Sequence, residues 1–151
     1  MLSPKKLKVS VWGQLNDPAH KGDAGRDVIA VAEPKIVGEK FGNSDKYYRR
    51  IDYIEYDTGV TIQPDEEVFA FSIPRSSISK HTNLFLGNSI GVIDTHFRDT
   101  IKFRFRYLPQ PEDYVFVEGR IFMSINPNRL YHKGDRIGQL IFSKQIGRAH
   151  V

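Results

Sequence analysis

The stretch "GNSIGVIDTHFRDTIKFRFRY", Gly87 to Tyr107, contains the most informative pattern in the chain. In its second half, four apolar and three cationic side chains alternate: Ile101, Lys102, Phe103, Arg104, Phe105, Arg106 and Tyr107. Successive side chains of a strand point to opposite faces, so this pattern predicts a β-strand with one apolar and one cationic face. The first half places two glycines, Asn88 and a lone aspartate, Asp94, just before that strand. Read by itself, Asp94 is most economically a turn residue, and a catalytic role is the alternative.

The composition predicts one globular domain spanning residues 1–151. The chain is 40% hydrophobic and 26% charged, which is ordinary for a soluble protein with its own core. No apolar run approaches the roughly 20 residues that cross a bilayer, and the N-terminal residues lack a signal-peptide core. We therefore expect no membrane association and a cytoplasmic location, or the host-cell cytoplasm if the protein is viral. The absence of cysteine excludes disulfides, thiolate zinc sites and cysteine nucleophiles.

The net charge of +4 favours a partner that carries phosphate, either nucleic acid or a nucleotide. A solvated surface with a small cationic surplus accounts for the same value.

Short runs rich in β-branched and aromatic residues recur along the chain. They lie at residues 6–13, 27–32, 48–60, 67–73, 100–107, 114–125 and 136–142. Residues typical of turns separate them, at 16–25, 61–67, 108–113 and 126–135. This punctuation predicts an all-β fold, a sandwich or a barrel, with little helix. The best helix candidate is one turn from Arg75 to Lys80, and two segments resemble insertions, Glu39 to Arg50 (most simply a solvated hairpin) and Glu118 to Asp135.

The common catalytic motifs are missing. The chain has no G-x-S-x-G elbow, no phosphate-binding G-x-x-x-x-G-K-[ST] loop and no H-E-x-x-H. Its histidines have no metal-ligand spacing: His20, His81, His96, His132 and His150.

Two stretches have residues suited to phosphate. "GDAGRD" (Gly22 to Asp27) combines glycines and acids ahead of an apolar strand, which is the pattern of a turn. "IPRSS" (Ile73 to Ser77) places an arginine and two hydroxyls where a strand ends. A guanidinium fork and consecutive backbone N–H groups suit a phosphate, and a capped turn explains the same residues.

Two further stretches have features suited to a base and to a buried strand. In "GNSIGVID" (Gly87 to Asp94) the glycines let a flat ligand approach the main chain. Asn88 offers both an amide donor and an acceptor, as a pyrimidine edge needs. "GDRIGQLIF" (Gly134 to Phe142) has Gln139 as its one uncharged polar residue within a strand.

Taken in order, these stretches resemble four motifs of the trimeric dUTPase family. The matches are "AGRDV" (24–28), "PRSS" (74–77), "GVIDTHFRD" (91–99, preceded by Asn88) and "GDRIGQLI" (134–141). A fifth family motif, a glycine-rich C-terminal arm that closes over the phosphates, has no match in "FSKQIGRAHV" (142–151).

The resemblance implies a jelly-roll-like β subunit that assembles into a homotrimer with active sites at the subunit interfaces. It implies Mg²⁺-dependent hydrolysis of dUTP to dUMP and pyrophosphate, without stable nucleic-acid binding. The Mg²⁺ would be held by phosphate oxygens and water rather than by the protein, consistent with its reluctance to lose water.

The resemblance also implies roles for individual residues. Asp94 would be the general base that activates water for attack on the α-phosphorus. Phe97 would stack on the deoxyribose where the family has a tyrosine. The residues implied to bind uracil are Asn88, Gly91, Val92 and Ile93. Those implied to bind the phosphates, from a neighbouring subunit, are Arg75, Ser76, Ser77 and Gln139. Supporting roles are implied for Asp27 and Arg98.

Other readings stay open at this point. Without the fifth motif, the chain could be a dUTPase-fold nucleotide-binding or regulatory protein with little hydrolysis. A dCTP deaminase needs a glutamate in the strand after the third motif, and "TIKFRFRY" has none. A structural jelly roll with coincidental motifs is the remaining alternative.

Overall fold

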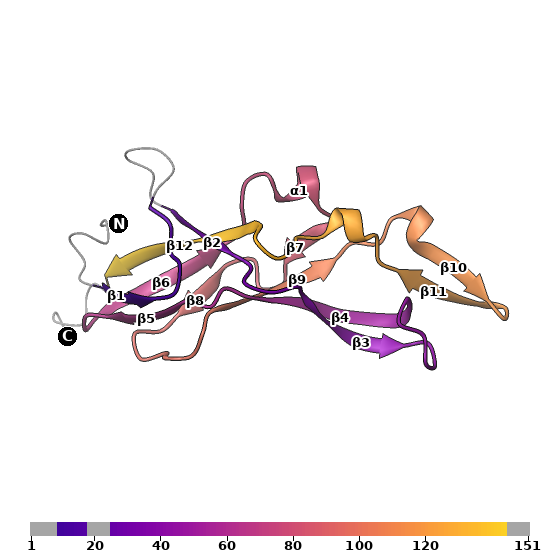
Figure 1. Cartoon of the computed structure of the whole chain (residues 1–151), viewed down its shortest axis with the longest axis horizontal. Helices are drawn as coiled ribbons and strands as arrows, with labels where there is room; N and C mark the ends of the chain where they lie inside the picture. The colour runs from indigo at the N-terminus through magenta and orange to yellow at the C-terminus, as the bar shows by residue number, and fades with distance from the viewer. Residues whose placement is uncertain (1–8, 18–24, 145–151) are drawn as a thin grey trace, which may run out of the picture.

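The computed structural model of the chain describes residues 9–17 and 25–144, and it is elongated and built mainly of antiparallel strands (Figure 1). The strands are β1 (Val9–Trp12), β2 (Arg26–Ile29), β3 (Lys35–Lys40), β4 (Tyr47–Asp57), β5 (Thr61–Pro64), β6 (Val68–Ile73), β7 (Leu84–Leu86), β8 (Gly91–Ile93), β9 (Lys102–Tyr107), β10 (Tyr114–Val117), β11 (Arg120–Ser124) and β12 (Arg136–Lys144). One short α-helix, α1 (Ile78–His81), and two 3₁₀ turns, η1 (Pro111–Asp113) and η2 (Pro127–Arg129), complete the described elements. The predicted all-β fold with little helix is confirmed.

The strands form three sheets. β1 and β5 make a two-stranded ribbon, and the order β2-β12-β6-β8 makes a four-stranded sheet, here called the motif sheet. The third, the long sheet, has the order β10-β11-β4-β9-β7, with β3 on the other edge of β4. Motif sheet and ribbon occupy one end of the molecule, and β3, β4, β10 and β11 extend to the other end (Figure 1).

The core lies where the motif sheet packs on the long sheet. Residues of both belong to a single buried cluster, among them Val28, Leu140 and Phe142 from one and Tyr56 and Phe105 from the other. The alternation predicted for residues 101–107 is observed in β9, where the phenylalanines are buried and the cations exposed. Burial of an apolar face on each sheet is therefore the main force that joins them.

Several element boundaries differ from the prediction. Residues 61–64, expected in a turn, form β5, because Ile62 and Pro64 are buried and pair with β1. The strand predicted for residues 48–60 ends earlier, at Asp57. The next residue, Thr58, donates its hydroxyl to Ile101 O (2.6 Å), and the chain turns there. The run 114–125 is two strands, β10 and β11, because residues 118 and 119 adopt positive φ and form a tight turn.

Candidate active site

The four motif stretches meet on the motif sheet. β2 starts within the first stretch, β6 leads directly into Pro74–Ser77, β8 belongs to the third stretch, and β12 to the fourth. All three strand pairs of this sheet are antiparallel. Stretches separated by up to about a hundred residues in sequence thus become neighbours through main-chain hydrogen bonds.

The residues of the first and fourth stretches that were predicted to serve the phosphates lie close together. In the sheet register, Gln139 lies opposite Asp27 on one side and Ile73 on the other. A Cβ atom at Gly25 would overlap Gln139 Oε1, so the glutamine side chain lies directly over this glycine. Asp27 pairs with Arg136 at 3.4 Å between Oδ2 and a guanidinium nitrogen. A side chain at position 25 would push the Gln139 amide out of this orientation.

The "PRSS" residues lie just beyond β6 and lead into α1. Arg75 is half-buried, and its main-chain oxygen accepts a hydrogen bond from Ile78 N (3.1 Å). Burial raises the pKa of Tyr131, and the positive charge of Arg75 opposes that rise, so the guanidinium lies near this buried phenol. Ser76 is exposed, and Ser77 begins α1 with no capping bond from its side chain.

A cavity of about 630 Å³ brings Asn88 and Phe97 together. Around them, the walls come from β7 and the loop after it, β4, β6, β9 and the loop before β9: Asp52, Tyr53, Ser72, Leu86, Gly87, Asp99, Thr100, Lys102, Phe103, Arg104 and Arg106. Asn88 is in a tight turn in which Ser89 N donates to Leu86 O (3.1 Å) and Ser89 has a φ of 61°. Phe97 presents a ring that is 42% exposed. The cavity therefore combines an amide and an accessible aromatic face.

Asp94 lies exposed at the end of β8. Within β8, Gly91 and Ile93 are buried and Val92 is exposed. Asp94 O accepts a hydrogen bond from Phe97 N (3.1 Å), and Arg98 donates to Thr95 O (2.6 Å). These bonds define the turn 94–98. Among the described residues, no hydrogen bond or ion pair involves the Asp94 carboxylate, which leaves it open to solvent.

The structure does not bring all the predicted residues together within one chain. Ile93, next to Asp94, lies opposite Ala70, whereas Gln139 lies opposite Ile73. Ala70 and Ile73 are three residues apart, which is about 10 Å along β6. Ile93 and Gln139 lie on opposite edges of β6, each about 5 Å to the side of it. Asp94 and the predicted phosphate-binding residues of one chain are thus too far apart to contact the same phosphate.

The cationic side chains of β9 line the cavity, a location that their alternation alone did not reveal. Arg104 donates to Glu55 (2.7 Å), which raises its pKa, and its guanidinium lies 4.7 Å from the centre of the Tyr53 ring. The hydrogen bond from Arg50 lowers the pKa of Asp52, and Arg106 contributes to that shift. Sequence reasoning also missed Ser72, which had no signal beyond being a lone polar residue in an apolar run.

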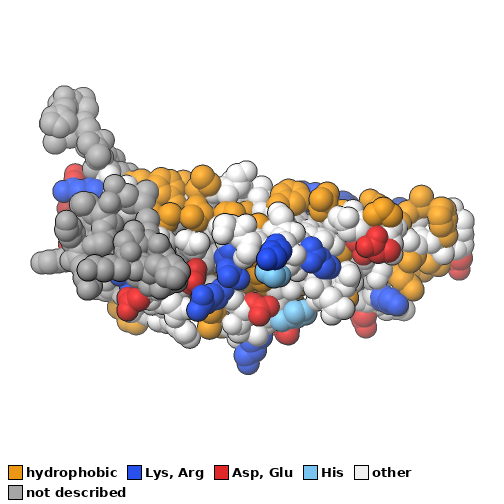
Figure 2. Space-filling model, turned by 90° about the horizontal axis from the view of Figure 1, so that it is seen from above, with side chains coloured by type: hydrophobic (Ala, Val, Ile, Leu, Met, Phe, Trp, Pro, Cys, Tyr) orange, Lys and Arg blue, Asp and Glu red, His pale blue; other side chains and the backbone are white. Residues whose placement is uncertain are grey.

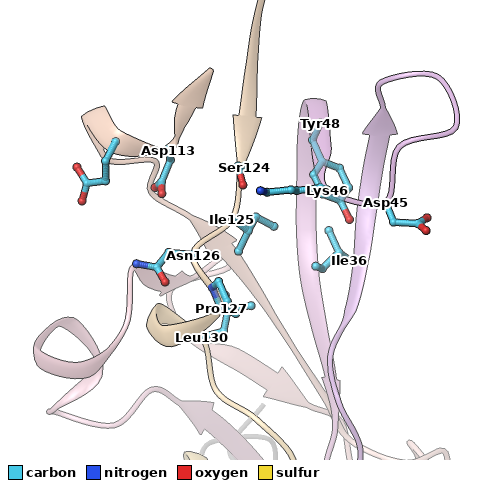
Figure 3. A pocket seen from close by; sticks show the side chains of 11 residues that line it. Ile36, Asp45, Lys46, Tyr48, Asp113, Ser124, Ile125, Asn126, Pro127 and Leu130 are labelled. Carbon is cyan, nitrogen blue, oxygen red and sulfur yellow. The ribbon is translucent and has the colours of Figure 1, made fainter. Parts of the chain in front are cut away.

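A second cavity, of about 610 Å³, lies between the β3–β4 hairpin and the segment from η1 to η2 (Figure 3). Its buried acid, Asp113, accepts hydrogen bonds at Oδ2 from Tyr107 Oη (2.7 Å) and Gln110 N (2.8 Å). Those bonds cap η1, which gives this carboxylate a structural role. None of the predicted site residues lines this cavity.

Within residues 9–17 and 25–144, no three His, Cys, Asp or Glu side chains are grouped as metal ligands. No helix in that part of the chain is long and apolar enough to span a bilayer. Residues 145–151, where a C-terminal arm would begin, and Ala24 of the first motif lie outside the described residues.

Comparison with known proteins identifies the fold. No protein-family model matches the chain, and no curated protein matches its sequence. Among solved structures, the dUTPase of Staphylococcus bacteriophage 80alpha has a TM-score of 0.64 and 18% identity, over 93% of this chain and 92% of that one. A mutant of that enzyme in complex with dUpNHpp has a TM-score of 0.63 at 18% identity, with 93% and 84% covered. A mutant dUTPase from S. aureus phage phi11, which coordinates a structural Mg(II) ion, has a TM-score of 0.59 and 20% identity, with 93% and 92% covered. The chain has the fold of these phage dUTPases.

Proposed function

We propose that this protein is a dUTP diphosphatase, which hydrolyses dUTP to dUMP and pyrophosphate. The observation that carries the proposal is the motif sheet: of four sequence stretches that resemble dUTPase motifs, three contribute strands to this sheet and the remaining one directly follows its strand β6, in a chain with a dUTPase fold. A coincidental resemblance would have no reason to gather these stretches in space.

The base and sugar would bind in the cavity that contains Asn88 and Phe97. Asn88 and the main chain of Gly91 to Ile93 would pair with the uracil edge, and a bound base would bury these groups so that a base leaving them unpaired is rejected. The exposed face of Phe97 would stack on the deoxyribose.

Asp94 would act as the general base. An exposed carboxylate with no partner among the described residues can accept a proton from water and hold that water in line with the α-phosphorus. Attack by the oxygen forms the bond to phosphorus and breaks the bond to the pyrophosphate leaving group. Arg98 would support this step by bonding the main chain of the turn that carries Asp94.

Arg75, Ser76, Ser77 and Gln139 would bind the phosphates from a neighbouring subunit of a homotrimer. The separation of Gln139 from Asp94 within one chain supports this division, and Asp27 would hold the neighbouring Arg136 in place. Exposed apolar side chains suited to subunit contacts are present, for example Phe116 (78% exposed) on the β10–β11 hairpin, the region at the right-hand end of Figure 2. Cytoplasmic location without stable nucleic-acid binding completes the proposal.

Mg²⁺ would arrive with the substrate. Phosphate oxygens and water would hold the ion, because Mg²⁺ gives up its bound water reluctantly. When bound, it would neutralise phosphate charge.

The test is pyrophosphate release from dUTP and Mg²⁺ by the wild-type protein and by Asp94→Asn. We expect the variant to be at least about 100-fold slower, the usual minimum for loss of a general base. It should still bind a non-hydrolysable dUTP analogue, because the amide keeps the size of the carboxylate. Asp65→Asn, an exposed aspartate in the turn before β6, is the matched control and should retain activity.

Binding of dUTP by the wild-type protein with no pyrophosphate at high protein concentration would refute the enzyme and favour a nucleotide-binding regulator. Failure to bind any deoxyuridine nucleotide would refute both.

A further inference from the structure

Ser72 is a buried polar residue with no partner among the described residues. It is only 7% exposed, and no hydrogen bond within 9–17 and 25–144 involves its hydroxyl. A hydroxyl that has no protein partner and faces a cavity is available to bond a water or a ligand there. Ser72 lines the same cavity as Asn88 and Phe97.

The position of Gly91 shows where the Ser72 hydroxyl lies. Gly91 is directly opposite Ser72 in the β6–β8 pair, so side chains at the two positions lie on the same face of the sheet. A Cβ atom at Gly91 would overlap Ser72 Oγ and lie 3.2 Å from Asn88 Nδ2. The serine hydroxyl therefore occupies the space beside Gly91, close to the asparagine amide, and a side chain at position 91 would displace it.

The surroundings of Ser72 suit a base better than a phosphate. Leu86 and Phe103, which also line the cavity, are buried and apolar. The cations of the cavity, Lys102, Arg104 and Arg106, are all exposed on the outer face of β9. Leu86 and Phe103 give the cavity an apolar part that suits the face of a flat heterocycle, and the neutral Ser72 hydroxyl suits its polar edge.

We propose that Ser72 is a third side chain of the base-binding end of the cavity, where its hydroxyl hydrogen-bonds the polar edge of the pyrimidine beside Asn88. A hydroxyl both donates and accepts, so it can pair with either a carbonyl or an N–H of that edge. This inference rests on the proposed function, since it assigns the cavity to the nucleobase.

Two probes separate the base end from the phosphate end: dUMP, which has the base and one phosphate, and inorganic triphosphate, which has no base. In calorimetric titrations we expect Ser72→Ala to bind dUMP about 3- to 10-fold more weakly, the effect of one lost neutral hydrogen bond. Its affinity for triphosphate should equal that of the wild type. Ser143→Ala, a half-buried serine of β12 that does not line the cavity, is the matched control and should change neither affinity.

Ser72→Cys tests the hydrogen bond apart from packing. Its thiol fills the space of the hydroxyl but is a weak hydrogen-bonding group, so dUMP affinity should fall toward that of Ser72→Ala. Wild-type affinity in Ser72→Cys would overturn the proposal, as would a Ser72→Ala protein that binds dUMP within twofold of the wild type.

Failure of the proposed function gives a different result. If the wild-type protein binds neither dUMP nor dUTP, the assignment of the cavity to a nucleotide is wrong. The proposed role of Ser72 is then refuted as well. A wild-type protein that binds dUMP tightly while Ser72→Ala is unchanged overturns the role of Ser72 alone.

Discussion

His132 has both ring nitrogens next to acceptors. Nε2 lies 2.6 Å from Pro127 O, and Nδ1 lies 3.0 Å from Glu33 Oε2. A neutral imidazole can donate from only one nitrogen, whereas the protonated ring donates from both. The carbonyl of Pro127 and, after it, the carboxylate of Glu33 therefore raise the pKa of His132 above its ordinary value of 6.5.

The sign of this shift gives a pH prediction. A raised pKa in the folded state means that protonated His132 stabilises the fold, fully so below pH 6.5. That contribution is lost as the pH rises through the higher folded-state pKa. The difference in urea midpoint between the wild type and His132→Gln should thus be larger at acidic pH than at alkaline pH. His81→Gln is the control, and a difference independent of pH would contradict the assignment.

Among individual residues, the sequence predicted the site residues that lie within a local motif. It missed Ser72, whose place in the cavity depends on the pairing of two strands. Asn88 and Phe97 are nine positions apart and were both predicted to contact the ligand, and one cavity contains them. Ser72 lies in an apolar run in which a serine has no local meaning. Its position opposite Gly91 follows from the pairing of β6 with β8, a contact that no short window of sequence encodes.

Among the elements, Tyr107 joins the end of β9 to the two 3₁₀ turns. Its hydroxyl donates to Asp113 Oδ2 (2.7 Å) and accepts from Asn126 N (3.1 Å) and Asn83 Nδ2 (3.4 Å). Since β10 and β11 lie between η1 and η2 in sequence, this one hydroxyl anchors both ends of their hairpin.

Tyr107→Phe should therefore destabilise the protein. It leaves the Asp113 carboxylate, 4% exposed, without one of its two donors, and an unsatisfied buried group costs about 1–3 kcal/mol. Urea unfolding measures the loss, with Tyr114→Phe as the control because Tyr114 is 48% exposed. Equal urea midpoints for Tyr107→Phe and Tyr114→Phe would show that the hydroxyl of Tyr107 contributes nothing to stability.

Elements with strict alternation were the best predicted. β9 was predicted from its alternating apolar and cationic residues, and the structure has a buried apolar face and an exposed cationic face in this strand. β5 was missed because Pro64, Asp65 and the acids after them signal a turn, while the partner that makes residues 61–64 a strand is β1, about fifty residues earlier. The short β3 and β7 were also missed, since each takes its strand form from pairing with a longer neighbour.

For the whole molecule, the distance between Asp94 and Gln139 makes a prediction about assembly. If each active site takes Asp94 from one subunit and Gln139 from another, Asp94→Asn and Gln139→Ala chains should complement each other. Each variant alone should release little pyrophosphate. Refolded together, they should regain activity, because some interfaces then combine an intact Asp94 with an intact Gln139.

Light scattering of the same samples should give the mass of a trimer. No recovery of activity in mixed trimers would mean that both residues act within one chain. A monomeric mass would contradict the shared site altogether.

The order β2-β12-β6-β8 also has a consequence for how the chain folds as it is synthesised. β12, the last described strand, lies between β2 and β6, and within the motif sheet β2 pairs only with β12. A nascent chain can form the β6–β8 pair early, but β2 has no place in that sheet until residues 136–144 have left the ribosome. Pairings so distant in sequence close slowly and leave strand edges exposed in the meantime. We therefore expect a chain stalled before Arg136 to have its β6–β8 pair and its "PRSS" turn, yet to be an aggregation-prone intermediate rather than a partial enzyme.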